Sequence, residues 1–271
     1  MAATPVSSAT RRACWRLRLG GPIGRRGATR LLLALGVIAV WEAGVHVGLI
    51  DPFFVSSPSG IAAMLARQFG TGTIYKHLAA TLQEALWGLG LGFLAGAALA
   101  WLATRSEMIA DLLDPVLLLL NSVPRIVLAP IFVMWLGIGL NSKIAVAFFL
   151  VFVVIFFAVS SGIREVDRSL VERIVVLGGS SRDLLVEVYI PSVLSWVFSS
   201  VRVAVGFAFT GAIVGEFVGA SSGLGYLMNF AQGSQNASLM MATVVVIMAV
   251  IAVLFAVLER VERRLMAWKQ P

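Results

Sequence analysis

Three stretches of the sequence run for twenty residues without a charged side chain, at residues 85–104, 144–163 and 239–258. A helix rises about 1.5 Å per residue, so roughly twenty apolar residues cross the bilayer core of about 30 Å. Hydrophobic residues make up 59% of the chain and charged residues only 13%, against about 25% charged in a soluble domain. The sequence therefore excludes an ordinary soluble enzyme and predicts an all-α polytopic membrane protein.

Three further apolar stretches carry polar residues and are also predicted to span, at residues 31–50, 115–140 and 192–219. The first contains Glu42 and His46 and is longer than the apolar core of a cleaved signal peptide. Pro124 and Pro130 interrupt the second, where we expect a kinked or broken helix that starts near Asp114. The prediction is six transmembrane helices.

Basic residues are unevenly distributed between the two sides that six spans define. If the N-terminus is inside, the outer segments hold only Arg67, Lys76 and Lys143. The inner segments hold seven arginines before residue 31 and a further set: Arg105, Arg164, Arg168, Arg173, Arg182, Arg260, Arg263, Arg264 and Lys269. The positive-inside rule then places both termini on the cytoplasmic side of the membrane.

The same distribution divides the chain into a basic cytoplasmic leader (1–30), a six-span membrane domain (31–259) and a basic tail (260–271). We expect the leader to meet anionic lipid headgroups rather than nucleic acid, although an acid-free, arginine-rich leader also fits an organellar transit peptide. On the outer side, Ser59 is expected to cap a short helix over 61–68. Residues 219–238 are expected to form a re-entrant or tightly packed cap.

Residues 164–187 carry nine charges in 24 positions. Burial of each in hydrocarbon would cost about 2.5–3.5 kcal/mol, so this segment must lie in the cytosol. Asp167 or Ser169 can cap a first amphipathic helix, and Gly178 and Gly179 form a turn before a second helix with a serine cap. A helix, glycine turn and helix with an apolar stripe is typical of a docking module.

A spaced motif extends from Glu172 through Gly178 to a Val-Tyr-Ile-Pro run that ends at Pro191. Its spacing resembles that of a cytoplasmic motif in binding-protein-dependent ABC importer permeases. In that motif, three residues separate Glu-Ala-Ala from glycine, and nine more precede Ile-x-Leu-Pro. The two alanines are Arg173 and Ile174 here, and Ser195 replaces a proline frequent in one branch of the family.

The resemblance extends over most of the chain and is closest to the nitrate, sulfonate, taurine and bicarbonate branch. Its remaining elements are Trp41-Glu42, Ser57-Pro58-Ser59, Asp114-Pro115, Val123-Pro124, Ala129-Pro130, Trp135-Leu136-Gly137-Ile138-Gly139, Val201-Arg202-Val203-Ala204, Glu216 and Ser222-Gly223-Leu224-Gly225-Tyr226. It implies a type I importer permease of the bacterial inner membrane. Such a permease forms a homodimer, receives cargo from a periplasmic or lipid-anchored binding protein, and is driven by a cytosolic ATPase dimer.

We find no catalytic or metal site in the sequence. The phosphate-binding pattern G-x-x-x-x-G-K-[ST] does not occur, so ATP and magnesium are expected on the partner ATPase and no cofactor on this chain. Two histidines and one cysteine do not supply the four ligands of a structural zinc site. The chain is therefore predicted to be a transporter subunit and not an enzyme.

The resemblance assigns ATPase coupling to one set of residues: Glu172, Arg173, Leu177, Gly178, Gly179, Arg182, Asp183 and Pro191. The simpler alternative is a set of solvated helix charges with an ordinary glycine cap. Two four-residue glycine repeats are candidates for helix packing, either within the chain or at a dimer seam: Gly88, Gly92, Gly96, Gly211, Gly215 and Gly219.

A second candidate set lies on the translocation path or gate: Asn121, Pro124, Arg125, Pro130, Arg202 and Glu216. A charge within a span is a functional hypothesis by default. Arg202 can add positive potential to an anion route, and Glu216 can meet the binding protein near the outer gate. Alternatively, both are structural and pair with residues such as Glu42 or Glu84.

The resemblance to this branch favours import of a small sulfonate-, nitrate- or taurine-like anion. A pyrimidine-type heterocycle or an aromatic acid is the alternative cargo. A self-contained ion-coupled carrier is the alternative mechanism, but it predicts an inverted internal repeat, which the sequence does not show. A structural membrane scaffold is the third alternative.

Overall fold

A computed structural model describes residues 23–105, 107–122 and 124–265. The predictions for the leader before Ile23, for Val123 and for the tail after Leu265 lie outside these residues. The described chain is helical, without a β-strand. Its α-helices are α1 (Ile23–His46), α2 (Pro58–Gly70), α3 (Thr73–Arg105), α4 (Glu107–Ser122), α5 (Leu128–Leu136), α6 (Leu140–Arg164), α7 (Arg168–Val176), α8 (Ser181–Leu184), α9 (Ile190–Val218), α10 (Leu224–Gly233) and α11 (Ala237–Leu265).

Four of these helices are long and apolar enough to cross a membrane. Their qualifying parts are Thr73–Ala103, Leu140–Arg164, Trp196–Val218 and Ala237–Arg263. They coincide with four of the six predicted spans, because each combines a length above the bilayer requirement with an almost uncharged sequence. These helices confirm the all-α membrane class.

The other two predicted spans differ from a single long helix. In the first, only Leu32–His46 qualifies, as a shorter apolar helix. In the second, α4 and α5 are separate helices joined by a 3₁₀ turn, η1 (Arg125–Val127). The break itself agrees with the expected interruption, but α4 begins at Glu107, well before Asp114. Pro115 lies inside α4, because a proline within an apolar helix removes one hydrogen bond without having to end the helix.

The core of the described chain lies where α3, α6 and α9 pack together. Helix α6 is the central one, and Val151, Ile155 and Phe156 on it are fully buried. The predicted glycine repeats allow this packing: a Cβ at Gly92 would lie 2.7 Å from the carbonyl oxygen of Phe148, and one at Gly211 would lie 2.6 Å from Cα of Ala147.

The remaining glycines of the two repeats have similar surroundings. Gly88, Gly96 and Gly215 approach α6 in the same way, whereas Gly219 faces Val133 of α5. Each of the six glycines thus has a close neighbour on another helix or segment of the described chain.

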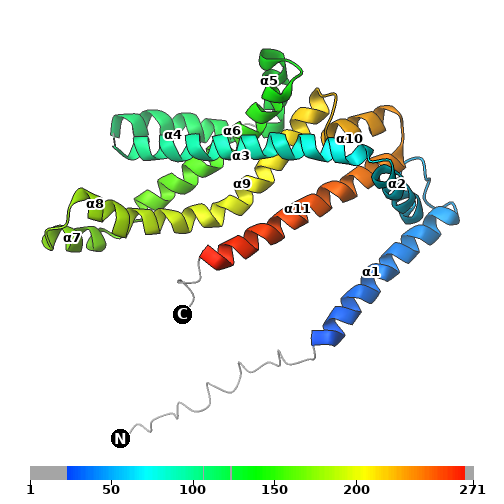
Figure 1. Ribbon diagram of the computed structural model, residues 1–271, viewed down its shortest axis with the longest axis horizontal. Coiled ribbons are helices and arrows are strands. Elements are labelled where there is room, and N and C mark those ends of the chain that lie inside the picture. The colour runs from blue at the N-terminus through cyan, green and yellow to red at the C-terminus, as the bar shows by residue number, and fades with distance from the viewer. Residues whose placement is uncertain (1–22, 106, 123, 266–271) are drawn as a thin grey trace, which may run out of the picture.

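The helices place two groups of short elements at opposite ends of the bundle (Figure 1). Helices α2 and α10 lie at the end where α3 begins and α9 finishes, whereas α7 and α8 lie at the other end. We refer to these as the α10 end and the α7 end. The segment 219–238, expected to be a cap, contains α10, which packs against α9 and α11.

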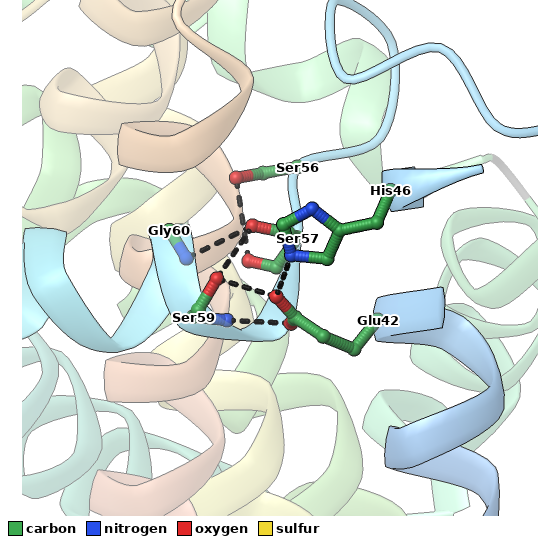
Figure 2. A network of polar contacts seen from close by, with 6 residues as sticks. All are labelled: Glu42, His46, Ser56, Ser57, Ser59 and Gly60. Atoms are coloured by element: carbon green, nitrogen blue, oxygen red, sulfur yellow. Dashed lines mark hydrogen bonds and ion pairs between the residues drawn. The ribbon is translucent and has the colours of Figure 1, made fainter. Parts of the chain in front are cut away.

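A polar network joins α1 to α2 at the α10 end (Figure 2). Glu42 accepts hydrogen bonds from the backbone N–H of Ser59 at 2.9 Å and from its hydroxyl at 2.6 Å, and it also contacts His46. Helix α2 begins at Pro58 with Ser57 as its N-cap, which accepts a bond from the N–H of Gly60. The expected cap, Ser59, is wrong, because proline favours the first helical position and places the cap one residue before it.

Candidate functional site

The glycine turn after α7 is a regular helix end. Gly178 has φ of 77°, and its N–H donates to the carbonyl of Val175, while the N–H of Gly179 donates to the carbonyl of Ile174. This pair of bonds is the Schellman motif, which reverses the chain at a residue with positive φ. At the other end of α7, Asp167 is the N-cap and accepts a bond from the N–H of Ser169 at 2.8 Å.

A capping box starts the second helix, α8. The side chain of Asp183 accepts hydrogen bonds from the hydroxyl and the N–H of Ser180, and the Ser180 hydroxyl accepts the N–H of Asp183. The two bonds to its carboxylate lower the pKa of Asp183, and the bond from the Ser180 hydroxyl has the larger effect. The chain then passes through a π-helical turn, η2 (Leu185–Tyr189), directly into α9. Residues 167–191, which we call the coupling segment, are thus a defined structure of two capped helices.

The coupling segment carries charged side chains and exposed apolar side chains next to one another. Glu172, Arg173 and Arg182 lie on its two helices, and Arg182 is exposed beside the capping box. Val176 and Leu177 are 84% and 85% exposed at the tip of the segment. Exposed aliphatic side chains beside charges are typical of a surface that a partner covers.

The other predicted coupling residues shape the segment. Gly178 and Asp183 are exposed in the turn and in α8, whereas Pro191 is partly covered where α9 begins. A Cβ at Gly179 would overlap Cγ2 of Ile174 and lie 2.9 Å from the carbonyl oxygen of the same residue, so the turn has no room for a larger residue there.

An apolar cavity of about 510 Å³ separates part of the coupling segment from the bundle. Leu184, Leu185 and Tyr189 line it from the segment, and Trp101 of α3 and Ile163 of α6 line it from the bundle. The segment is therefore continuous with α9 but is not closely packed against α3 and α6.

The predicted path residues are not brought together in one place. Pro124 precedes η1 and Pro130 follows it, and both are exposed. The side chains of Asn121 and Arg125 lie outside the described residues. Arg202 lies on α9, where it forms an ion pair with Glu262 of α11 at 3.3 Å. Its partner is therefore a different residue from the two proposed from the sequence.

A buried polar cluster at the α10 end surrounds the sixth predicted path residue, Glu216. Glu216 is 1% exposed, and Glu84 of α3 and Lys143 of α6 are each 4% exposed. Glu84, Glu216 and Lys143 lie close enough to interact electrostatically with one another. We call Glu216, Glu84, Lys143 and the α3 residues Thr81 and His77 the Glu216 cluster.

The Glu216 cluster binds the turn that precedes α10. Thr81 donates its hydroxyl to Glu216 at 2.6 Å and accepts the N–H of Leu224 at 2.9 Å. The N–H of Gly223 donates to Nδ1 of His77 at 3.0 Å, and the N–H of Gly225 donates to Glu216 at 2.7 Å. The first amides of α10, which a helix cannot satisfy internally, are thus bound by side chains from α3 and α9.

The sequence alone points to Glu216 and names Glu84 as a structural partner, but it does not reveal Lys143, Thr81 or His77 as members of the cluster. The positive-inside rule assigns Lys143 to an outer segment, because it precedes the uncharged stretch of α6. The available signal is the set of polar side chains near the ends of spans on three different helices, since intramembrane charges usually pair with one another.

Comparison with known proteins agrees with this architecture. Residues 88–267 match the family "Binding-protein-dependent transport system inner membrane component". The riboflavin transport system permease protein RibX of Chloroflexus aurantiacus is 30% identical over 233 residues, covering 86% of this chain and 87% of that protein. The putative aliphatic sulfonates transport permease protein SsuC of Escherichia coli is 31% identical over 236 residues, covering 87% and 90%.

The formylaminopyrimidine transport permease protein ThiX of Halalkalibacterium halodurans is 29% identical over 239 residues, covering 88% of this chain and 95% of that protein. Among solved structures, an inward-facing MetNI methionine ABC transporter matches with a TM-score of 0.59 and 18% identity, covering 71% of this chain and 95% of that chain. This structural match supports the fold. Together, the family match and the relatives show that the chain belongs to the inner membrane components of binding-protein-dependent transport systems.

Proposed function

We propose that this chain is the membrane permease subunit of an ABC importer, with the coupling segment as its contact to a cytosolic ATPase dimer. The observation that carries the proposal is the pair of capped helices around Gly178, whose apolar tip at Val176 and Leu177 has no cover within the described chain. The motif spacing and the family match support it. ATP and magnesium belong to the partner ATPase in this proposal, and this chain carries no cofactor.

The proposed orientation places the α7 end in the cytoplasm and the α10 end on the outer side of a bacterial inner membrane. The excess of arginine in the predicted inner segments supports it. A second copy of the chain would complete the permease, and a binding protein would deliver solute at the α10 end. Each proposed partner contacts a different surface, so the assembly is testable piece by piece.

The deciding experiment is transport by the full-length chain co-reconstituted with the ATPase and binding protein encoded beside it. We expect solute uptake into proteoliposomes only when ATP and the binding protein are both present. Uptake driven by an ion gradient without ATP would instead show the ion-coupled carrier. A complex that forms but transports nothing would leave the scaffold as the remaining function.

We propose a small sulfonate-like anion as the cargo, with a pyrimidine-type heterocycle as the second candidate. The sulfonate permeases SsuC of E. coli and of Bacillus subtilis are 31% and 28% identical to this chain. The riboflavin and formylaminopyrimidine permeases are 30% and 29% identical, which makes the heterocycle the second candidate. Competition between taurine and a pyrimidine for binding-protein-dependent uptake decides between the two.

Arg202→Gln is expected to leave the preference between anionic and neutral solutes unchanged. The guanidinium is committed to Glu262, and this half-exposed ion pair stabilises the fold by at most about 1 kcal/mol. Initial uptake rates of taurine and of a neutral solute measure the preference. Glu262→Gln is the matched control and should behave alike. A selective loss of anion uptake in Arg202→Gln alone would contradict the structural role and assign Arg202 to the path.

A further inference from the structure

The Glu216 cluster places two glutamates and a lysine in a volume with little access to water. Glu84, Lys143 and Glu216 come from three different helices, α3, α6 and α9, and all three are buried. A charge buried at membrane depth is strongly unfavourable unless neighbouring groups neutralise it. The net charge of the cluster is therefore what determines whether these helices can close together.

The two neighbouring carboxyl groups require a proton. Two ionised carboxylates side by side in a buried volume repel each other, and the single positive charge of Lys143 balances only one of them. Glu216 accepts bonds from the hydroxyl of Thr81 and the N–H of Gly225, one on each of its carboxylate oxygens, which assigns the negative charge to it. Oε2 of Glu84 is buried without a hydrogen-bond partner. Glu84 thus carries the proton.

With one proton on Glu84, the cluster is electrically neutral, because the negative charge of Glu216 balances the positive charge of Lys143. Without that proton, the cluster has one uncompensated negative charge next to a like charge. The other titratable groups that face this region are His77 and Lys76 of α3 and Tyr226 of α10, whose ring stacks on His77 with centroids 5.7 Å apart. His77 accepts the N–H of Gly223 at Nδ1, so it is neutral in the closed arrangement.

We propose that Glu84, Lys143 and Glu216 form a proton-dependent latch that holds the turn before α10 closed against α3. This proposal rests on the proposed function, in which the α10 end is the outer end of the permease, and it adds a mechanism for opening there. Loss of the proton from Glu84 drives the two carboxylates apart, and Glu216 then releases Thr81 and the amide of Gly225. The turn at residues 223–225 loses the acceptors that bind it to the bundle.

Proton linkage determines the direction and size of the change in latch opening with pH. The closed latch holds one proton more than an open form in which Glu84 reaches water and ionises. The equilibrium constant for opening therefore rises about tenfold for each pH unit. This dependence begins at the pH where an exposed carboxyl ionises and ends at the pH where Glu84 ionises in the closed cluster. Protonation of His77 on Nδ1 also weakens the closed turn, but it does so at low pH, because it removes the acceptor of the Gly223 N–H.

Hydrogen–deuterium exchange of the full-length permease in lipid nanodiscs tests the latch, read on peptides covering residues 219–227. Rates are divided by the intrinsic rate at each pH, from about pH 7 to about pH 9, above the range where His77 protonates. We expect wild-type protection of the Gly223, Leu224 and Gly225 amides to fall by up to about tenfold per pH unit. Glu84→Gln should keep the protection at all pH values, because a neutral amide has no proton to lose and adds no negative charge beside Glu216.

Glu165→Gln is the matched control, since Glu165 is an exposed glutamate at the α7 end, and it should follow the wild type. Infrared spectroscopy of the wild type supplies a second measurement that needs no variant. The carbonyl stretch of a buried protonated carboxyl should be present throughout the pH range in which protection falls, because the closed form keeps its proton there. Protection that does not change with pH, or that Glu84→Gln abolishes at every pH, would show that closure of the turn does not depend on a proton on Glu84 and would overturn the latch.

Neither measurement uses the ATPase, the binding protein or a solute. Failure of the latch therefore leaves the importer proposal standing. Failure to assemble with an ATPase would remove the importer proposal while the exchange data still report on the latch.

Discussion

Replacement of Gly178 by valine is expected to reduce the ATPase recovered with the permease by at least about tenfold, since each 1.4 kcal/mol changes an association constant tenfold. Gly178 has φ of 77°, a conformation that costs an L-residue roughly 1–2 kcal/mol and a β-branched residue more. Valine would force the turn out of the Schellman geometry, so α7 and α8 would no longer present one surface. Affinity purification of the tagged permease, co-expressed with the ATPase, measures the loss.

Gly48 provides a matched control for this prediction. It has φ of 79°, and a Cβ added there, as at Gly178, would have no atom within 4 Å, but Gly48 lies between α1 and α2. Gly48→Val imposes the same backbone strain at the α10 end and should leave ATPase recovery unchanged. Gly178→Asn should be intermediate, because asparagine adopts positive φ more easily. Full ATPase recovery with Gly178→Val would contradict the coupling role.

Gly92→Ala is expected to destabilise the permease by about 1–3 kcal/mol, the usual effect of adding a methyl group to a close-packed interior. The new Cβ would lie 2.7 Å from the carbonyl oxygen of Phe148 and 2.8 Å from Cβ of Val151. Neither atom can move without shifting α6, the central helix. The melting temperature in detergent should fall by about 2–4 °C for each kcal/mol.

Gly90→Ala is the control, because Gly90 lies in the same helix with no atom within 4 Å of the added methyl group. It should be neutral or slightly stabilising, since alanine favours a helix more than glycine does. The two substitutions thus have the same chemistry and opposite expected signs. Equal melting temperatures for both variants would show that α3 and α6 do not approach as closely as described.

The helices that sequence analysis locates best are those whose properties are local. Uncharged runs of membrane length identify α3, α6 and α11, and the charge density after residue 163 separates the coupling segment from the spans. The caps of that segment are also predictable, because Asp167 and Ser180 are residues whose side chains bind nearby amides. In each case, a short piece of sequence determines the structure.

Features that depend on tertiary contacts are not predictable to the same degree. The start of α4 at Glu107 shows that Pro115 is a weaker helix boundary than its sequence position suggests. The Glu216 cluster joins side chains from α3, α6 and α9, which are far apart in the chain. A hydropathy pattern gives each helix separately but not which faces meet, so Thr81 and His77 carry no signal of their own.

Helix α1 is fastened to the rest of the described chain mainly through α2, by the bonds that Glu42 makes to Ser59. Its apolar side chains, among them Leu33 and Val40, remain exposed along its length. A helix anchored at one point shares little packing with the three-helix core, so its sequence can vary without disturbing that core. The first helix is in this sense peripheral, and its replacement is expected to leave the packing of α3, α6 and α9 intact.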